Sequence, residues 1–337
     1  MKLFLAKLAN GRSLSEIEAE EAFEVIMSGT ATPSQLGAFL MALRLRGETV
    51  EEITGAARIM RAKALQVKAP ADAIDTCGTG GDGSGTYNIS TATALVVAGC
   101  GVPVAKHGNK AMSSKSGTAD VLAEMGVNLE ATPEVIERSL TQANIGFLFA
   151  QRHHTAMKHV AAVRQDLGIR VIFNLIGPLS NPAGTKRQLL GVFAREWLEP
   201  LAQTLGNLGS EKAWVVHGSD GLDELTTTGP TFVAALESGK VKNFIIKPED
   251  AGLPVSAPED LIGGDSKTNA SALKRLLAGE PSAYRNIVLL NAAAALIVAD
   301  KTNSLKDGVS VAAAAIDNGS AAAALDKLVS ISSGPLE

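Results

Sequence analysis

Aromatic side chains and runs of basic residues are scarce in this sequence of 337 residues. Aromatic residues make up 4% of it, and no run of five or six lysines or arginines occurs. The formal charge is −4, whereas a general polyanion-binding protein usually carries a basic face. We therefore expect no nucleic-acid partner. Any phosphate must be bound locally, by loop amides, a few basic side chains and metal.

Cysteine and long apolar runs are also scarce. Cys77 and Cys100 are the two cysteines and no CxxC occurs, which excludes a disulfide scaffold, and we expect both thiols to be reduced and buried. The longest apolar run, 292–299, is far shorter than the roughly 20 residues that a membrane-spanning helix needs. Lys7 interrupts the short apolar start and no small-residue cleavage site follows it. These features predict a soluble, cytoplasmic protein with no membrane partner.

Residues 1–70 carry only helical signals. Three capping patterns, each a Ser or Thr followed three residues later by Glu or Gln, begin at Ser13, Thr32 and Thr49. Apolar residues at helical spacing follow each one, and Gly29 and Gly47 end the first two helices. Helices this short cannot bury their apolar stripes alone, so we expect them to pack on each other or on a partner chain.

Strand and helix patterns alternate after residue 70. Strands are expected at 73–77, 102–105, 188–193, 213–217 and 242–246, with helices at 88–100, 196–208, 271–277, 292–299 and 309–316. This alternation predicts an α/β domain with a mostly parallel central sheet flanked by helices.

The length suggests about two domains. Helices expected at 132–144 and 155–166 should fold back onto the first helices. The predicted organisation is a small all-helical domain, 1–70 joined by helices from about 132–180, and a larger α/β phosphoribosyl-binding domain, 71–131 and 181–337.

A glycine-rich segment, GTGGDGSGT, follows the first predicted strand. Gly78, Gly80 and Gly83 match the dinucleotide-binding pattern G-x-G-x-x-G, which also needs an acidic residue about 20 positions later. No Asp or Glu lies between Asp82 and Asp120, so we set that interpretation aside. A P-loop is excluded because no Gly-Lys-Ser/Thr closes the segment.

Two interpretations of the glycine-rich segment remain. It is either a plain tight turn or a loop whose backbone N–H groups approach a phosphate. The second interpretation is favoured by residues 88–91, which add side-chain donors and the positive end of a helix.

Two further loops carry chemical groups. Residues 106–110, KHGNK, and 113–117, SSKSG, follow the next strand and suit phosphate oxygens, although loop lysines are usually solvated. Asp223 and Glu224 follow a later strand. Alone they would be surface residues, but opposite two phosphate loops they suit Mg²⁺.

A polar stretch at 152–159 precedes Arg164. His154 and Lys158 are four residues apart and are expected to share a helix face. The three histidines of this stretch lack the Cys or Glu that would complete a zinc site. An ordinary polar helix face is the alternative to a specificity site.

Four stretches together resemble the anthranilate phosphoribosyltransferases over nearly the whole chain. They are DTCGTGGDGSGTYNIST (75–91), KHGNKAMSSKSGTADVLAEMG (106–126), AMKHVAAVRQDLGIRVIFNLIGPLSNPAG (156–184) and VVHGSDGLDELTTTGPT (215–231). KHGN and SGTAD by themselves are shared with the pyrimidine nucleoside phosphorylases of the same superfamily. The resemblance implies transfer of a phosphoribosyl group to anthranilate in tryptophan biosynthesis.

The resemblance also implies residue roles. The donor, phosphoribosyl pyrophosphate, would contact Gly78, Gly81, Asp82, Thr86, Asn88, Ile89, Ser90, Thr91, Lys106, His107, Gly108, Asn109, Lys110, Ala111, Met112, Ser113, Ser114 and Thr118. Anthranilate would contact Gly78, His107, Asn109, His154, Arg164 and Pro178. Two Mg²⁺ ions would be held by Ser90, Asp223 and Glu224, and the catalytic groups would be Lys106, Asp223 and Glu224. A homodimer through the helical domain is implied as well.

Four positions depart from the family pattern: Lys110 replaces Arg, Thr118 replaces Ser, and Gln151 and Thr155 replace prolines. Lys110 keeps the charge but lacks a planar fork. The alternatives to the family activity are a nucleoside phosphorylase, which has no evident use for the carboxylate pair, and a non-catalytic relative that binds nucleic acid. The expected chemistry is direct displacement at the anomeric carbon, assisted by electrostatic stabilisation of the departing pyrophosphate.

Overall fold

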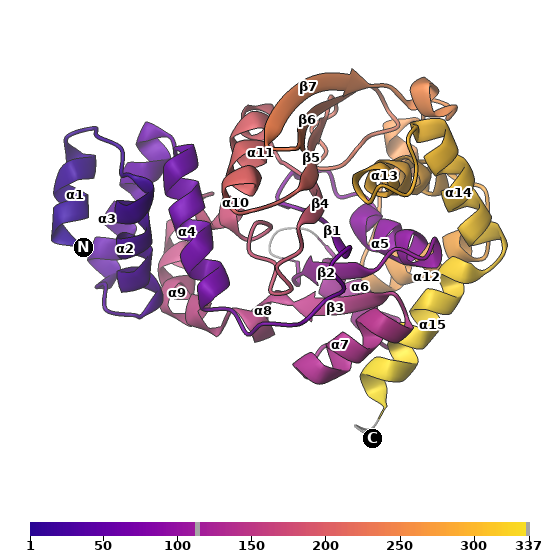
Figure 1. Cartoon of the computed structure of the whole chain (residues 1–337), viewed down its shortest axis with the longest axis horizontal. Helices are drawn as coiled ribbons and strands as arrows, with labels where there is room; N and C mark the ends of the chain where they lie inside the picture. The colour runs from indigo at the N-terminus through magenta and orange to yellow at the C-terminus, as the bar shows by residue number, and fades with distance from the viewer. Residues whose placement is uncertain (112–114, 335–337) are drawn as a thin grey trace.

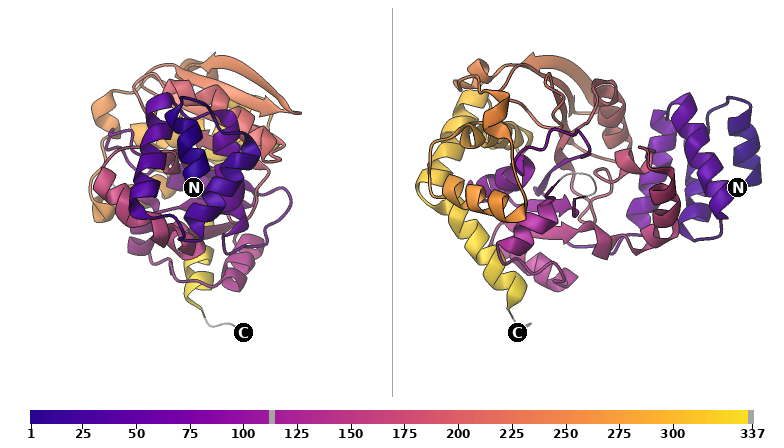
Figure 2. Two further views of the ribbon diagram at one scale, coloured as in Figure 1. Left: turned by 90° about the vertical axis from the view of Figure 1, so that its left-hand side faces the viewer. Right: turned by 180° about the vertical axis from the view of Figure 1, so that it is seen from behind.

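The computed structural model describes residues 1–111 and 115–334, and Figures 1 and 2 show a small helical end beside a larger α/β body. The strands are β1 Ile74–Gly78, β2 Val104–Gly108, β3 Ile145–Phe149, β4 Arg187–Gly191, β5 Lys212–Gly218, β6 Thr231–Glu237 and β7 Lys240–Ile246. The helices before β4 are α1 Lys2–Ala9, α2 Glu16–Met27, α3 Pro33–Arg46, α4 Val50–Ala62, α5 Ile89–Gly99, α6 Thr118–Glu124, α7 Pro133–Gln142, α8 Ala150–His153, α9 Lys158–Leu167 and α10 Phe173–Ile176. Those after it are α11 Leu198–Asn207, α12 Ser266–Leu277, α13 Ala283–Val298, α14 Leu305–Asp317 and α15 Ser320–Ser333.

The starts of α2, α3 and α4 at the helical end are set by local capping. Thr32 and Thr49 each form the predicted capping box with the residue three positions on. The first box was placed wrongly at Ser13, because Ser15 is the cap and pairs with Glu18. Both serines have a glutamate three residues later, so the local pattern could not choose between them.

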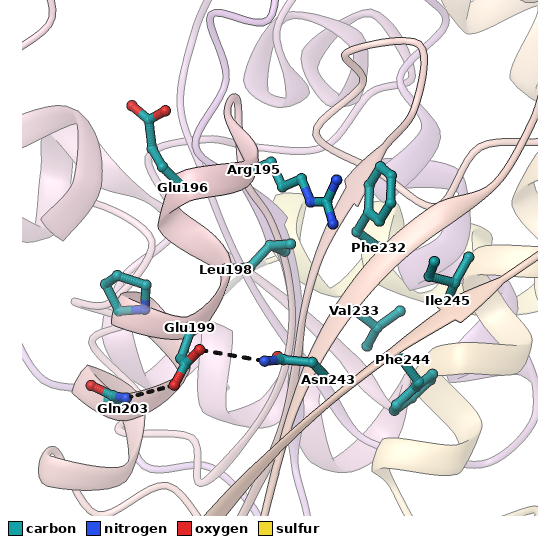
Figure 3. A pocket seen from close by; sticks show the side chains of 11 residues that line it. Arg195, Glu196, Leu198, Glu199, Gln203, Phe232, Val233, Asn243, Phe244 and Ile245 are labelled. Carbon is teal, nitrogen blue, oxygen red and sulfur yellow. Dashed lines mark hydrogen bonds between the residues drawn. The ribbon is translucent and has the colours of Figure 1, made fainter.

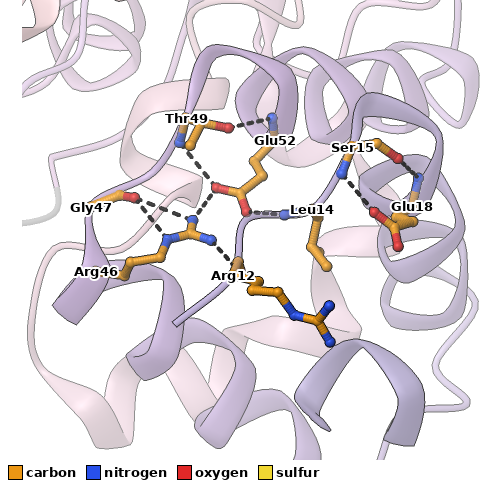
Figure 4. A network of polar contacts seen from close by, with 8 residues as sticks. All are labelled: Arg12, Leu14, Ser15, Glu18, Arg46, Gly47, Thr49 and Glu52. Carbon is orange, nitrogen blue, oxygen red and sulfur yellow. Dashed lines mark hydrogen bonds and ion pairs between the residues drawn. The ribbon is translucent and has the colours of Figure 1, made fainter. Parts of the chain in front are cut away.

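A buried carboxylate holds these helices together (Figure 4). Glu52 is 0% exposed and accepts hydrogen bonds from the backbone N–H of Thr49 at 3.0 Å and of Leu14 at 2.8 Å. It also pairs with Arg46, whose guanidinium donates to the carbonyl of Arg12 at 3.0 Å. One side chain therefore fixes the 10–14 loop against the α3–α4 turn, where a lone buried charge would be costly.

The central sheet has seven strands in the order β3-β2-β1-β4-β5-β6-β7. The first five are parallel, whereas β6 and β7 are antiparallel, so the predicted mostly parallel sheet is confirmed. The sequence analysis missed β3 and β6. Each is a short run with no strict alternation of apolar and polar residues, and such runs cannot be told from helix segments by periodicity alone.

Helices cover both faces of the sheet (Figure 1). One face packs on α5 and α13, with α14 and α15 outside them. The other face packs on α11, and its apolar core continues into the helical end through Phe23 and Phe173. The helical end is therefore packed directly against the body that carries the sheet.

Two expectations for the middle of the chain need correction. The helix expected at 132–144 was predicted to join the helical end, but α7 packs on β3 and α15 instead. The stretch at 152–164 was predicted as one helix, but the chain breaks at His154, whose φ of −111° and ψ of 58° are not helical. His154 and Lys158 therefore share no continuous helix face. In contrast, α9 packs on α2 and α3, and α10 packs on α4.

Among the described residues, no single helix is long and apolar enough to cross a bilayer. The pair α14 and α15 satisfies that criterion only when counted together, across a bend of 61°.

Candidate functional site

The predicted phosphate loops meet at the carboxyl edge of the sheet. The chain runs from β1 to β2 and β3 on one side and returns to β4 on the other side of β1. Strand order therefore reverses between β1 and β4, and open α/β sheets bind ligands in the crevice outside such a reversal. The glycine-rich loop leaves β1 at this point. Beside it, Lys106, His107 and Gly108 lie within β2 itself, which extends beyond the predicted strand 102–105, and residues 109–110 leave its end.

Asp223 lies across the ends of β1 and β4. Gly78 and Gly191 are register partners in these strands, and a Cβ on either would overlap Asp223, at its side-chain oxygen and its carbonyl oxygen respectively. The backbone N–H of Gly80 donates to Oδ2 of Asp223 at 2.6 Å. The two glycines therefore create the space that seats this carboxylate beside the glycine-rich loop. Sequence reasoning missed Gly191, which lies outside the predicted loops.

The glycine-rich loop needs its glycines for conformation. Gly80, Gly81, Gly83 and Gly85 have φ between 65° and 77°, the left-handed region that other residues rarely adopt. A Cβ on any of them would meet nothing within 4 Å, so crowding is not the reason. Successive residues of this kind can turn backbone N–H groups toward an anion.

The end of the loop is clamped at Asn88. Its carboxamide oxygen accepts from Asn269 at 2.8 Å, and its amide donates to the carbonyl of Ser116 at 3.3 Å. The Tyr284 hydroxyl donates to its backbone carbonyl at 3.2 Å. Asn88 thus ties the first predicted loop to the second. It was predicted only to contact the substrate, so this structural role is new.

Lys106 brings a buried positive charge under the same site. Its side chain is 2% exposed, and its Nζ donates to the carbonyl of Thr76 at 2.6 Å and to Oγ of Ser90 at 3.4 Å. Ser90 lies in the first turn of α5, and its backbone partly opposes the rise in the pKa of the Glu224 carboxylate. The structure therefore gathers Lys106, Ser90 and Glu224, as predicted for a common site.

The carboxylates of Asp82, Asp223 and Glu224 repel one another. Burial, and to a smaller extent the negative charge of Asp82, raise the pKa of Asp223 to about 7. Burial, and to a smaller extent the negative charge of Asp223, raise the pKa of Glu224 well above its usual range. Lys106 opposes both shifts, but they remain upward. A cation between these groups would relieve the repulsion.

The oxygen atoms gathered at this site suit Mg²⁺. Among the described residues, no three or more His, Cys, Asp or Glu side chains lie close enough to hold one ion. Mg²⁺ does not require such a cage, because it is usually bound by one or two carboxylates together with waters and substrate phosphates. Asp223, Glu224 and the Ser90 hydroxyl supply oxygens of that kind.

The second loop is tied at both described ends by Asp120. Its Oδ2 accepts from the N–H groups of Ala111 and Gly117, both at 2.9 Å. Thr118 accepts from the Thr91 hydroxyl at 3.2 Å, so its replacement of Ser keeps a hydroxyl in place. Lys110 has its ammonium 5.9 Å from the Phe149 ring centroid. The predicted ligands Met112, Ser113 and Ser114 lie outside the described residues.

Two of the predicted acceptor-site residues form a buried pair. Nε2 of His107 and Nε2 of His154 are 3.2 Å apart, and burial lowers both pKa values, that of His154 to about 4. Both rings are neutral at pH 7, so one donates its N–H to the other. His154 also contacts the backbone of Ser180, which partly opposes the fall in its pKa.

Arg164 and Pro178 lie apart from this pair in the described contacts. The Arg164 guanidinium is 5.5 Å from the Phe173 ring centroid, and burial lowers its pKa. The carbonyl of Pro178 accepts from Gln188 at 2.8 Å. No hydrogen bond between described residues joins Arg164 to either histidine.

Buried side chains beneath the site were also missed by sequence reasoning. Asp75 is 0% exposed and accepts from the backbone N–H of His107 at 3.1 Å and from the amide of Asn181 at 2.8 Å. Asn291 brackets Leu225, next to Glu224, by accepting from its N–H and donating to its carbonyl. Asp75 lay within a recognised motif, but only the fold pairs it with Asn181.

A depression of about 650 Å³ lies elsewhere, between α11 and strands β6 and β7 (Figure 3). Arg195 stacks there on Phe232, with its guanidinium carbon 3.7 Å from the ring centroid. None of the predicted ligands lines it.

Comparison with known proteins covers both parts of the chain. Residues 2–64 match the helical bundle domain of a glycosyl transferase family, and residues 70–322 match the a/b domain of such a family. A protein from Parvibaculum lavamentivorans called anthranilate phosphoribosyltransferase is 63% identical over 99% of this chain and 98% of its own length.

Solved structures give the same similarity. A crystal structure of anthranilate phosphoribosyltransferase from Thermus thermophilus has a TM-score of 0.94 at 43% identity, over 98% of this chain and 99% of that chain. The Saccharomyces cerevisiae enzyme in complex with PRPP and Mg has a TM-score of 0.90 at 28% identity, over 98% of this chain and 97% of that one.

Proposed function

The chain belongs to the anthranilate phosphoribosyltransferases, and we propose that its active site is the group of residues at the carboxyl edge of β1, β2 and β4. The enzyme transfers the 5-phosphoribosyl group from phosphoribosyl pyrophosphate to the amine of anthranilate. The products are N-(5-phosphoribosyl)anthranilate and pyrophosphate, in tryptophan biosynthesis. The two alternatives, a nucleoside phosphorylase and a non-catalytic nucleic-acid binder, are set aside.

The observation that carries the site proposal is the seat of Asp223. A pair of register-matched glycines lets its backbone and carboxylate cross the strand ends, beside a loop that has four glycines at positive φ. We propose that Gly78, Gly81, Asp82, Thr86 and 88–91 bind the donor phosphates, completed by 106–114 and Thr118. The start of α5 adds the positive end of a helix dipole.

Mg²⁺ is used by this enzyme, and we propose that Ser90, Asp223 and Glu224 hold it, as two ions. When bound, Mg²⁺ would neutralise charge that develops on the departing pyrophosphate. Lys106 adds a fixed positive charge beneath the same oxygens, already oriented by Thr76 and Ser90. Charge that is fixed before the reaction needs no reorganisation in the transition state.

The reaction is proposed as a direct displacement. The amine nitrogen of anthranilate forms a bond to the anomeric carbon, the bond from that carbon to pyrophosphate breaks, and the amine then loses a proton. An aromatic amine is already neutral at pH 7, so no strong base is required to free its lone pair. The main task of the protein is to hold two substrates in line.

For the acceptor, we propose that Arg164 binds the carboxylate and that Asn109 and Gly78 contact anthranilate. His107, His154 and Pro178 would line its path. His107 and His154 are neutral and bonded to each other, so they would add no positive charge beside Arg164. The carboxylate end of anthranilate would therefore be drawn to Arg164. A guanidinium can grip both carboxylate oxygens at once.

We also propose a homodimer through the helical end. Three large apolar side chains there are mostly exposed: Leu3 by 84%, Ile17 by 68% and Leu45 by 79%. Contact with a second copy of the chain would remove these side chains from water. Sedimentation velocity should give twice the chain mass, and a monomer for Leu45→Glu. The cytoplasmic location remains a prediction from the sequence, and cell fractionation would test it.

The decisive test of the site is an assay of anthranilate fluorescence with phosphoribosyl pyrophosphate and Mg²⁺. Fluorescence should decay only when both are present. Turnover that persists in excess chelator would contradict the proposed Mg²⁺ site.

A further inference from the structure

We propose that Arg170 is a positioning residue that holds the glycine-rich loop in its donor-binding conformation. The proposal rests on the donor site proposed above, since it concerns the shape of the same loop. Arg170 lies in neither predicted substrate group. It follows α9 and the left-handed Gly168 that ends it, and it precedes α10.

Two contacts direct the Arg170 side chain to the loop. Its Nη1 donates to the carbonyl of Gly81 at 3.0 Å, and its guanidinium carbon is 4.4 Å from the Phe193 ring centroid. Phe193 follows β4, and its backbone N–H donates to Oγ1 of Thr79 at 3.0 Å. The ring that supports Arg170 is therefore tied to the start of the same loop.

The rest of the loop has few external anchors. The N–H of Thr79 donates to Gly191 at 2.9 Å, Gly80 is held by Asp223, and the carbonyl of Gly85 accepts from Gly263 at 2.9 Å. Between these points, Asp82 and Ser84 hydrogen-bond to each other. Among the described residues, Arg170 is the one side chain from 150–180 that hydrogen-bonds to the loop.

The contact matters because a peptide group is planar and trans. Its C=O and the following N–H point in opposite directions. When Arg170 draws the Gly81 carbonyl toward itself, it turns the Asp82 N–H the other way. Gly81 and Asp82 are both proposed donor ligands. Glycine residues can adopt many backbone conformations, so a hydrogen bond to the Gly81 carbonyl restricts the conformations open to the glycine-rich loop.

Arg170→Ala should therefore raise the KM for phosphoribosyl pyrophosphate about 5- to 20-fold, the effect of losing one hydrogen bond from a charged donor at a partly solvated site. The kcat at saturating donor and the KM for anthranilate should stay within about twofold, because the reacting groups are retained. Arg170→Lys should recover part of the donor affinity, since an ammonium can reach a carbonyl but cannot stack as a planar group.

Arg195→Ala is the matched control. It removes another guanidinium stacked on a phenylalanine, 3.7 Å from the Phe232 ring centroid, in the depression that holds no proposed ligand. Its donor KM should match that of the unmodified enzyme. Melting temperatures of all variants should agree within about 3 °C, which separates loop positioning from general loss of stability.

Phe193→Leu tests the route of the effect. If the ring acts by supporting Arg170, the double variant Arg170→Ala/Phe193→Leu should lose no more donor affinity than Arg170→Ala alone. Additive losses would overturn this route.

The inference itself is overturned if Arg170→Ala leaves the donor KM within twofold, or if Arg195→Ala changes it equally. Failure of the proposed site would look different. In that case the Asp223→Ala/Glu224→Ala double variant would also keep normal donor use, whereas failure of the inference alone leaves that variant impaired.

Discussion

Replacing Gly191 with alanine should impair donor use although no proposed ligand is changed. A Cβ at this position would overlap the carbonyl oxygen of Asp223, which belongs to backbone and cannot rotate away. The 222–224 segment must therefore lift from the ends of β1 and β4. Asp223 would then lose its hydrogen bond from Gly80, now 2.6 Å long.

The size of the effect has two parts. Insertion of a methyl group into a packed site costs about 1–3 kcal/mol of stability. Loss of a hydrogen bond to a charged group costs about 1.5–3 kcal/mol. If the second part falls on the transition state, kcat/KM for the donor should drop roughly 10- to 150-fold, at 1.36 kcal/mol per tenfold. The Mg²⁺ concentration for half-maximal rate should rise as well.

The assay is anthranilate fluorescence with donor and Mg²⁺ varied in turn, alongside thermal unfolding. Gly37→Ala in α3 is the control, because its Cβ would meet only Val163 at an ordinary 3.8 Å. That variant should keep normal kinetics and equal or slightly higher stability, since alanine favours a helix interior. A Gly191→Ala enzyme with unchanged Mg²⁺ dependence would refute the role given to this glycine.

Four further outcomes are expected. The double variant Asp223→Ala/Glu224→Ala should lose donor use far more than anthranilate binding, which donor-varied kinetics and calorimetry would measure; normal activity at low Mg²⁺ would show the pair to be mere surface. Arg164→Ala should reduce kcat/KM for anthranilate roughly 30-fold to several thousand-fold, the effect of losing one partner of a desolvated charge pair at about 2–5 kcal/mol, with donor affinity nearly intact; an effect on the donor alone would move Arg164 to the phosphate site. Because the pKa of Asp223 is raised to about 7, protons should compete with Mg²⁺, so apparent Mg²⁺ affinity should fall as the pH drops below 7. The metal-free protein should in turn gain stability as the pH falls from about 7 toward 5, because the folded state then binds the extra proton, and Asp223→Asn should flatten that change.

Much of the site was predictable because its motifs are local. The glycine-rich loop and the Asp223–Glu224 pair each follow a strand in sequence, residues 106–108 end another strand, and parallel strands bring their carboxyl ends together. Arg170 and Asp75 were within recognised stretches but had no assigned role. Their partners, Gly81 and Asn181, lie 89 and 106 residues away along the chain. No periodicity reports contacts at such separations.

The sequence by itself determined the features that depend on near neighbours. These are the capping boxes at Thr32 and Thr49, the alternation that makes a mostly parallel sheet, and the glycines that permit left-handed turns. The tertiary structure decided the rest: α7 packs against β3 because a core partner was available there, and the chain breaks at His154, where that ring pairs with His107. Gly191 is required only because the backbone of Asp223 crosses it. No residue near Gly191 in the sequence indicates that contact. Local patterns set the conformations that each segment can adopt, whereas burial and charge, summed over contacts distant in sequence, select which segments meet.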